Sequence, residues 1–267
     1  MGAKLAQIAI YFPEKVLSNE ELSQQIPEWA AEKIGDKIGI STRHIANEDE
    51  TALDMAVKAS ERVLTDELKN RIDFILLCTQ SPDYLLPTSA CIMQDRLGLR
   101  TDIGALDFNL GCSGFIYGLA LSKGLIASGI ASNILLVMSE TYTKHIHKTD
   151  KSNRSIFGDG AAAVIVEKST FENIGEFVLG TDGSGKDNLI IHSGGMRNRL
   201  IATEGKLFQD NQEILNPGYL YPVQTSKCNA LLMETTCETH WPRDLLPVKR
   251  KKAIIIFSIK NFFVFIH

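Results

Sequence analysis

The chain has 267 residues, a formal net charge of −4, and 44% apolar and 22% charged residues. This composition is that of an ordinary globular protein, and the net negative charge argues against a nucleic-acid-binding surface. The N-terminus lacks the long apolar region of a signal peptide, and the most apolar run, residues 253–266, is too short for a membrane span and contains Lys260. The five cysteines form no C-x-x-C pair, which favours a reducing compartment. We therefore expect a cytoplasmic protein with neither a membrane nor a nucleic-acid partner.

In chain order, residues 1 to about 180 predict alternating strands and helices. The predicted strands lie at 5–12, 71–80, 104–110, 133–140 and 156–168. The predicted helices run from Asn19 to about Lys33, from the capping box of Thr51, from Pro87 to about Gly98, and from Cys112 to about Ser128. The strands at 71–80 and 133–140 are apolar throughout, as buried parallel strands are. This alternation predicts an α/β fold with a mostly parallel central sheet.

Cys112 is the leading candidate for a reactive residue. It lies in DFNLGCSGFIYGLALSKGLI (107–126), where a short strand passes through a glycine-flanked cysteine into a helix. The unpaired N–H groups and the positive dipole at a helix N-terminus favour a thiolate. Gly111 allows a sharp turn, and Gly114 is expected to leave room beside the sulfur. The alternative is a buried cysteine that only fills space.

Other motifs favour structural roles. Gly158, Asp159 and Gly160 are interpreted as turn-builders, because a phosphate loop would need different spacing and a lysine. His145 and His147 have no third ligand nearby, so we predict no metal site. The basic run 249–252 is interpreted as a solvated surface, with nuclear localisation or lipid binding as the alternative. Residues 216–252 fit neither a helix nor a strand pattern.

The Cys112 segment resembles the active-site segment of β-ketoacyl-acyl carrier protein synthase III, a condensing-enzyme family of the thiolase superfamily. The segments 38–56, 73–99, 156–168 and 174–191 resemble further segments of that family in the same order. The resemblance implies a thiolase-like fold of αβαβα layers built from two similar halves, usually as a homodimer. Residues 1–175 would form the complete first half, which carries the nucleophile. Residues 176–267 would be an incomplete and divergent second half.

The resemblance also implies an acyltransferase of fatty acid biosynthesis. Cys112 would attack an acyl-CoA, and the acyl-cysteine would then be condensed with malonyl-acyl carrier protein. No cofactor is needed, because the CoA thioester is itself a substrate. Trp29 would stack on the CoA adenine, with a partly exposed helix aromatic as the alternative. Lys151 and Arg154 would lie near the CoA entrance and meet phosphates or an acidic carrier protein, with ordinary surface charges as the alternative.

Two further roles, for four residues, follow from the same resemblance. Arg43 and His44 fall in a family motif and are assigned to structure. Leu85 and Leu86 are candidates to line the acyl pocket near the dimer partner.

The family's second catalytic half is not recognisable in this sequence. Its histidine in a His-Gln-Ala-Asn run, its asparagine in a Gly-Asn-Thr run and its closing Gly-Phe-Gly turn are all absent. We therefore hypothesise a frameshifted or truncated coding sequence that diverges near residue 222. The first half-reaction would survive in part, and condensation would be lost. The alternative is a catalytically inactive fragment or partner subunit.

Overall fold

The computed structural model describes residues 2–25, 30–148, 150–191, 196–197, 256–258 and 263–265. The predictions made for Trp29, for residues 216–252 and for the basic run 249–252 lie outside the described residues. The hypothesis of a shifted reading frame after residue 222 also concerns that part of the chain and stays a prediction.

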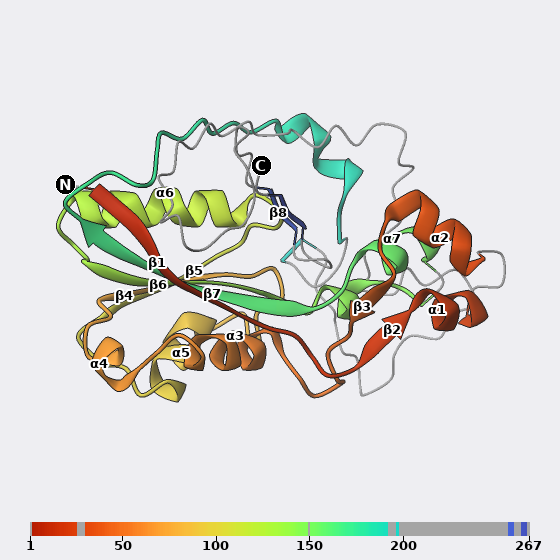
Figure 1. Cartoon of the computed structure of the whole chain (residues 1–267), viewed down its shortest axis with the longest axis horizontal. Helices are drawn as coiled ribbons and strands as arrows, with labels where there is room; N and C mark the ends of the chain where they lie inside the picture. The colour runs from red at the N-terminus through yellow and green to blue at the C-terminus, as the bar shows by residue number, and fades with distance from the viewer. Residues whose placement is uncertain are drawn as a thin grey trace, which may run out of the picture.

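A five-stranded sheet forms the centre of the described structure, in the order β1-β7-β6-β4-β5. These strands are β1 (Gly2–Tyr11), β4 (Phe74–Cys78), β5 (Gly104–Phe108), β6 (Asn133–Glu140) and β7 (Gly160–Ser169). β4 is parallel to both β5 and β6, whereas β7 is antiparallel to β6 and to β1. The prediction of a mostly parallel sheet is therefore wrong, because the sheet is mixed. The chain passes from β6 to β7 at one end of the sheet (Figure 1), without the crossover helix that a parallel pair requires.

The central strands are apolar because both of their faces are buried. Leu76, Leu136 and Val164 lie side by side across β4, β6 and β7, and none of them is exposed. They belong to the apolar cluster that includes Phe115 and Leu119 of α6 (Gly114–Ala127). The alternate residues of the same strands pack with the helices on the opposite face.

Helices cover the sheet on both faces, which gives three layers (Figure 1). On the face opposite α6 lie α3 (Ala52–Glu61), α4 (Asp66–Lys69) and α5 (Ser89–Arg96). The capping box predicted at Thr51 is confirmed, since its side chain accepts from Asp54 N–H and the Asp54 carboxylate accepts from Thr51 N–H. The predicted division at residue 175 stays a prediction.

Two predicted helices differ from the observed ones. Instead of one helix over 19–33 there are α1 (Asn19–Gln25) and α2 (Ala31–Ile38), and the sequence between them contains Pro27, which lacks the N–H that a continuous helix needs. Pro87 precedes α5 instead of starting it. The first two N–H groups of α5, from Ser89 and Ala90, both donate to the Asp107 carboxylate of β5 at 2.6 Å.

Short elements gather at one end of the sheet (Figure 1). They include β2 (Val16–Ser18), β3 (Thr42–His44), the 3₁₀ helix η1 (Tyr142–His145) and α7 (Lys151–Ile156). The remaining elements are the 3₁₀ helix η2 (Gly183–Asn188) and a small antiparallel pair, β8 (Ile256–Ser258) and β9 (Phe263–Phe265).

Arg43 joins these short elements, as its structural assignment predicted. Its guanidinium is completely buried and donates to Asn19 Oδ1 at 2.7 Å and to the Ser155 carbonyl at 3.0 Å. We expect Arg43→Met to lower the free energy of unfolding by about 3 kcal/mol, because buried acceptors from α1 and α7 would lose their donor. Urea unfolding would measure this. Arg71→Met, at a half-exposed arginine, should change the stability by less than about 0.5 kcal/mol.

Candidate active site

The carboxyl ends of the parallel strands β4, β5 and β6 meet at one edge of the sheet, where ligands of α/β folds commonly bind. β5 leads to the turn that holds Cys112. Of the other two parallel strands, β4 is followed by Gln80 and Ser81, and β6 ends at Glu140 and is followed by Tyr142.

Cys112 has the local structure that the sequence predicts. It lies in a turn between β5 and α6, and its side chain is exposed. The turn is closed by a hydrogen bond from Gly114 N–H to the Gly111 carbonyl at 2.8 Å. Ser113 occupies the N-cap position of α6 without a capping hydrogen bond from its side chain, so Cys112 lies just before the positive end of a 14-residue helix. Its role as a nucleophile stays a prediction.

The sulfur beside Gly114 is not that of Cys112. A Cβ at position 114 would overlap Cys78 Sγ. The expectation that Gly114 leaves room beside the Cys112 sulfur is therefore corrected, because the room that it leaves is beside Cys78. Cys78 is buried, and its Sγ donates to the Leu110 carbonyl at 2.9 Å. Burial, together with the nearby charge of Glu140, raises the pKa of Cys78 to about 12. Cys78 is therefore a neutral, packed thiol, whereas Cys112 is the exposed cysteine of the turn.

We expect Gly114→Ala to destabilise the protein by about 1–3 kcal/mol, because the added methyl group would displace Cys78 and the start of α6. Gly124→Ala is the matched control on the same helix, since nothing lies within 4 Å of its Cβ position. The control should be neutral, or more stable by up to about 1 kcal/mol. Equal effects of the two substitutions in urea unfolding would contradict the prediction.

Glu140 is a buried carboxyl group at this edge that the sequence interpretation did not single out. It accepts from Gln80 N–H at 2.6 Å and from the Ser81 hydroxyl at 2.7 Å. Burial raises its pKa to about 8, and the charge of Asp159 acts in the same direction. Its position at the end of an apolar parallel strand is the sequence signal that could have identified it.

Tyr142 links Glu140 with Cys112 electrostatically. Burial is the main cause that raises the pKa of Tyr142 to about 12, and the negative charges of Glu140 and Cys112 raise it further. The three groups therefore share one electrostatic environment. Asp159 lies nearby as well, and its carboxylate joins distant segments by accepting from Ala46 N–H at 2.8 Å and from Thr143 N–H at 2.9 Å. Its interpretation as a turn-builder stays a prediction.

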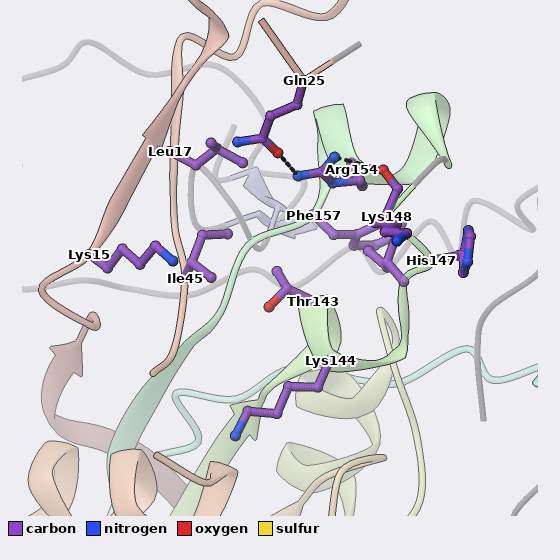
Figure 2. A pocket seen from close by; sticks show the side chains of 11 residues that line it. Lys15, Leu17, Gln25, Ile45, Thr143, Lys144, His147, Lys148, Arg154 and Phe157 are labelled. Atoms are coloured by element: carbon purple, nitrogen blue, oxygen red, sulfur yellow. Dashed lines mark hydrogen bonds between the residues drawn. The ribbon is translucent and has the colours of Figure 1, made fainter. Parts of the chain in front are cut away.

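A cavity of about 610 Å³ lies beside η1 and α7 (Figure 2). No carboxylate of the described residues lines it. The lining includes the cations Lys15, Lys144, Lys148 and Arg154, and also His147. In the described part of the chain, none of the four lysine and arginine side chains forms an ion pair with a carboxylate. The cavity thus presents positive charge, which suits a phosphorylated or otherwise anionic ligand.

The cations of this cavity are held in different ways. Arg154 donates to the Lys148 carbonyl at 2.7 Å and to Gln25 Oε1, which fixes its guanidinium at the wall (Figure 2). The ammonium group of Lys144 donates to the carbonyls of Glu48 and Glu50 and points away from the other cations (Figure 2). Lys15 is exposed on the opposite wall.

The predicted substrate-binding residues are only partly brought together. Arg154 lines the cavity, whereas Lys151, the first residue of α7, does not, and Trp29 lies outside the described residues. Leu85 and Leu86 are 76% and 83% exposed and lie away from this lining. Lys15 and Lys148 were missed, because isolated lysines in loops carry no sequence signal.

Among the residues that the structure describes, no cluster of three or more His, Cys, Asp or Glu side chains could hold a metal ion. No helix in that part of the chain is long and apolar enough to cross a membrane.

Known proteins resemble this chain in sequence and in fold. The family model of 3-oxoacyl-[acyl-carrier-protein (ACP)] synthase III matches residues 106–183, which include Cys112. The β-ketoacyl-[acyl-carrier-protein] synthase III of Xanthomonas axonopodis pv. citri is 38% identical over 189 residues, which are 70% of this chain and 58% of that protein. The chain thus spans less than two thirds of the length of this curated relative.

Solved structures give the same result. A 3-oxoacyl-(acyl-carrier-protein) synthase III crystal structure aligns with a TM-score of 0.74 and 45% identity, over 83% of this chain and 67% of that one. The corresponding synthase of Burkholderia xenovorans LB400 aligns with a TM-score of 0.71 and 30% identity, over 83% and 63%. The fold is therefore that of the thiolase-like condensing enzymes. Within them, the chain belongs to the β-ketoacyl-acyl carrier protein synthase III family.

Proposed function

We propose that this chain transfers an acyl group from acyl-CoA to Cys112. The observation that carries the proposal is the exposed cysteine in the turn before α6, at the carboxyl edge of the parallel strands. In the reaction the Cys112 sulfur attacks the thioester carbonyl, the bond to the CoA sulfur breaks, and CoA leaves and takes up a proton. The product is an acyl-cysteine, which remains an activated thioester. The Cys112 N–H would stabilise the oxyanion of the tetrahedral intermediate.

The basic cavity supports acyl-CoA as the donor. CoA carries several phosphate charges, and the cavity offers the cations of Lys15, Lys148 and Arg154 without a lining carboxylate. The short helix η1 connects the two parts of the site, because Thr143 and Lys144 line the cavity while Tyr142 shares the electrostatic environment of Cys112. Lys151 and Trp29 stay predicted CoA contacts.

We expect Lys15→Ala to raise the KM for acyl-CoA by about three- to ten-fold with an unchanged rate at saturation, since it removes a charge–phosphate contact made in both the ground and transition states. Acyl-enzyme formation at varied acyl-CoA concentrations would measure this. Lys168→Ala, at an exposed lysine near the end of β7, is the matched control and should leave KM unchanged. A lower rate at saturation with the same KM would contradict the assignment.

The complete family reaction would continue with malonyl-acyl carrier protein as the second substrate, in a cytoplasmic homodimer. We do not assign that step to residues of this chain, because the sequence contains neither the His-Gln-Ala-Asn nor the Gly-Asn-Thr run. The second candidate function, an inactive fragment or partner subunit, rests on the same observation.

Incubation of the full 267-residue chain with acetyl-CoA, or with longer acyl-CoA esters, tests the proposal. We expect the intact mass to increase by one acyl group, located on the Cys112 peptide, with release of one CoA thiol per acylated chain. A chain that releases no CoA and gains no mass with any of these donors would contradict acyl transfer and favour the inactive alternative. Subsequent addition of malonyl-acyl carrier protein would then test condensation separately.

A further inference from the structure

Glu140 is joined by hydrogen bonds to the strand end that lies between it and Cys112. In the sheet, β4 separates β6, which ends at Glu140, from β5, which leads to Cys112. The Glu140 side chain is buried, and its two oxygens accept from residues that follow β4, Gln80 N–H at 2.6 Å and the Ser81 hydroxyl at 2.7 Å. The carboxyl group therefore fixes the position of the β4 end.

The end of β4 in turn holds the segment before Cys112. Gln80 Nε2 donates to Asn109 Oδ1 at 3.2 Å, and Gln80 Oε1 lies 2.8 Å from the Cβ position of Gly111. Thr79 N–H donates to the Phe108 carbonyl at 3.2 Å. Together with the bond from Cys78 Sγ to the Leu110 carbonyl, these hydrogen bonds hold Phe108, Asn109 and Leu110, and the Gln80 side chain occupies the space beside Gly111.

We propose that Glu140 is a positioning residue for Cys112, acting through the Gln80 bridge on the turn that presents the thiol. The inference rests on the proposed role of Cys112 in acyl transfer, and it adds a residue that does not touch the substrate. The effect passes through the β4 end, because Gln80 bonds both to Glu140 and to the segment before Cys112.

The protonation state of Glu140 adds a second effect. The titratable groups that face it are Cys78 from β4, Tyr142 from η1, Asp159 from the turn before β7, and His145 through the Ser81 hydroxyl, whose Oγ lies 3.3 Å from His145 Nε2. With a pKa of about 8, Glu140 is mostly neutral at pH 7 and can donate to Ser81, whereas its ionised form can only accept. Ionisation therefore changes the hydrogen bond between Glu140 and Ser81 that holds the β4 end.

Alkylation of Cys112 by iodoacetamide, followed on the Cys112 peptide by mass spectrometry, tests this independently of acyl-CoA. Glu140→Gln imitates the neutral acid, because its carbonyl can accept from Gln80 and its amide can donate to Ser81. We expect Cys112 of Glu140→Gln to be alkylated at a rate within two-fold of the wild-type rate at pH 7. At pH 9 the wild-type rate should be at least two-fold below that of the variant. Glu140→Ala removes both bonds and should be alkylated at least ten-fold more slowly at pH 7.

Gln80→Ala is the second variant, because it removes only the side-chain bridge and should also slow alkylation at pH 7 if Glu140→Ala does not fold. Glu167→Gln is the matched control, a partly exposed glutamate on β7 opposite Asn133, at the other end of β6 from Glu140. Its alkylation should follow the wild-type profile at both pH values. Wild-type rates at pH 7 in folded Glu140→Ala or Gln80→Ala would overturn the inference, as would an unchanged pH profile in Glu140→Gln.

Acylation by acetyl-CoA separates this inference from the proposed function. If wild type is alkylated but never acylated, acyl transfer fails while the alkylation differences still decide the role of Glu140. If wild type is acylated and Gln80→Ala reacts like wild type in both assays, acyl transfer stands and the positioning role fails. A positioning role also requires that Gln80→Ala lowers the acylation rate at saturation with little change in KM.

Discussion

Cys112→Ser is expected to reduce acyl transfer from acyl-CoA below detection, a fall of at least about a thousand-fold, because a neutral hydroxyl is a far weaker nucleophile than a thiolate. The measurement is the intact mass of the chain after incubation with acetyl-CoA, together with the CoA thiol released. Folding should be unaffected, since the Cys112 side chain is exposed and the substitution changes only one atom.

The matched control is Cys91→Ser, at another exposed cysteine, in the first turn of α5. It should be acylated at the wild-type rate. Acylation that persists in Cys112→Ser, or that disappears in Cys91→Ser, would place the acyl group on a different thiol and contradict the assignment.

The second large effect concerns stability and pH. The pKa of Glu140 is about 8 in the folded protein and 4.5 without the fold, so the folded chain binds more protons than the unfolded chain between these values. Stability should therefore decrease as the pH rises from about 4.5 to 8, and this one group accounts for at most about 5 kcal/mol. The amide of Glu140→Gln does not titrate, so the variant should lack this loss and be the more stable protein at pH 8.

Urea unfolding of the wild type and of Glu140→Gln at pH 5 and pH 8 would measure the difference. Glu167→Gln is again the control, and its stability should vary with pH as that of the wild type does. Parallel stability changes in wild type and Glu140→Gln would show that Glu140 is ionised at low pH in the folded protein, and would contradict the burial argument.

Local sequence patterns predicted the individual elements well. The apolar run 133–140 coincides with β6, and the capping box at Thr51 is present with both of its hydrogen bonds. These predictions succeeded because a continuous apolar strand and a helix start depend on residues close together in sequence. The predicted single helix over 19–33 is wrong because that stretch contains Pro27, which has no N–H to continue a helix.

Contacts between distant segments were not predictable in this way. The alternation of helices and strands suggested parallel pairing, but the direction of β7 depends on the path that the chain takes around the end of the sheet. The neighbour of Gly114 is a cysteine 36 positions earlier, and no local pattern identifies such a pair. The basic cavity likewise combines Lys15 with Arg154, which lie in segments far apart in the chain.

The sequence by itself determined the strand–cysteine–helix turn of Cys112, and its resemblance to a known segment identified the family. It also determined that the family's later histidine and asparagine motifs are absent from these 267 residues. Only the tertiary structure decided which cysteine is packed and which is exposed, and that a buried glutamate reaches the Cys112 turn through Gln80. The reason is physical: turn and helix propensities act over a few residues, whereas burial and charge at the strand ends arise only when β4, β5 and β6 lie side by side.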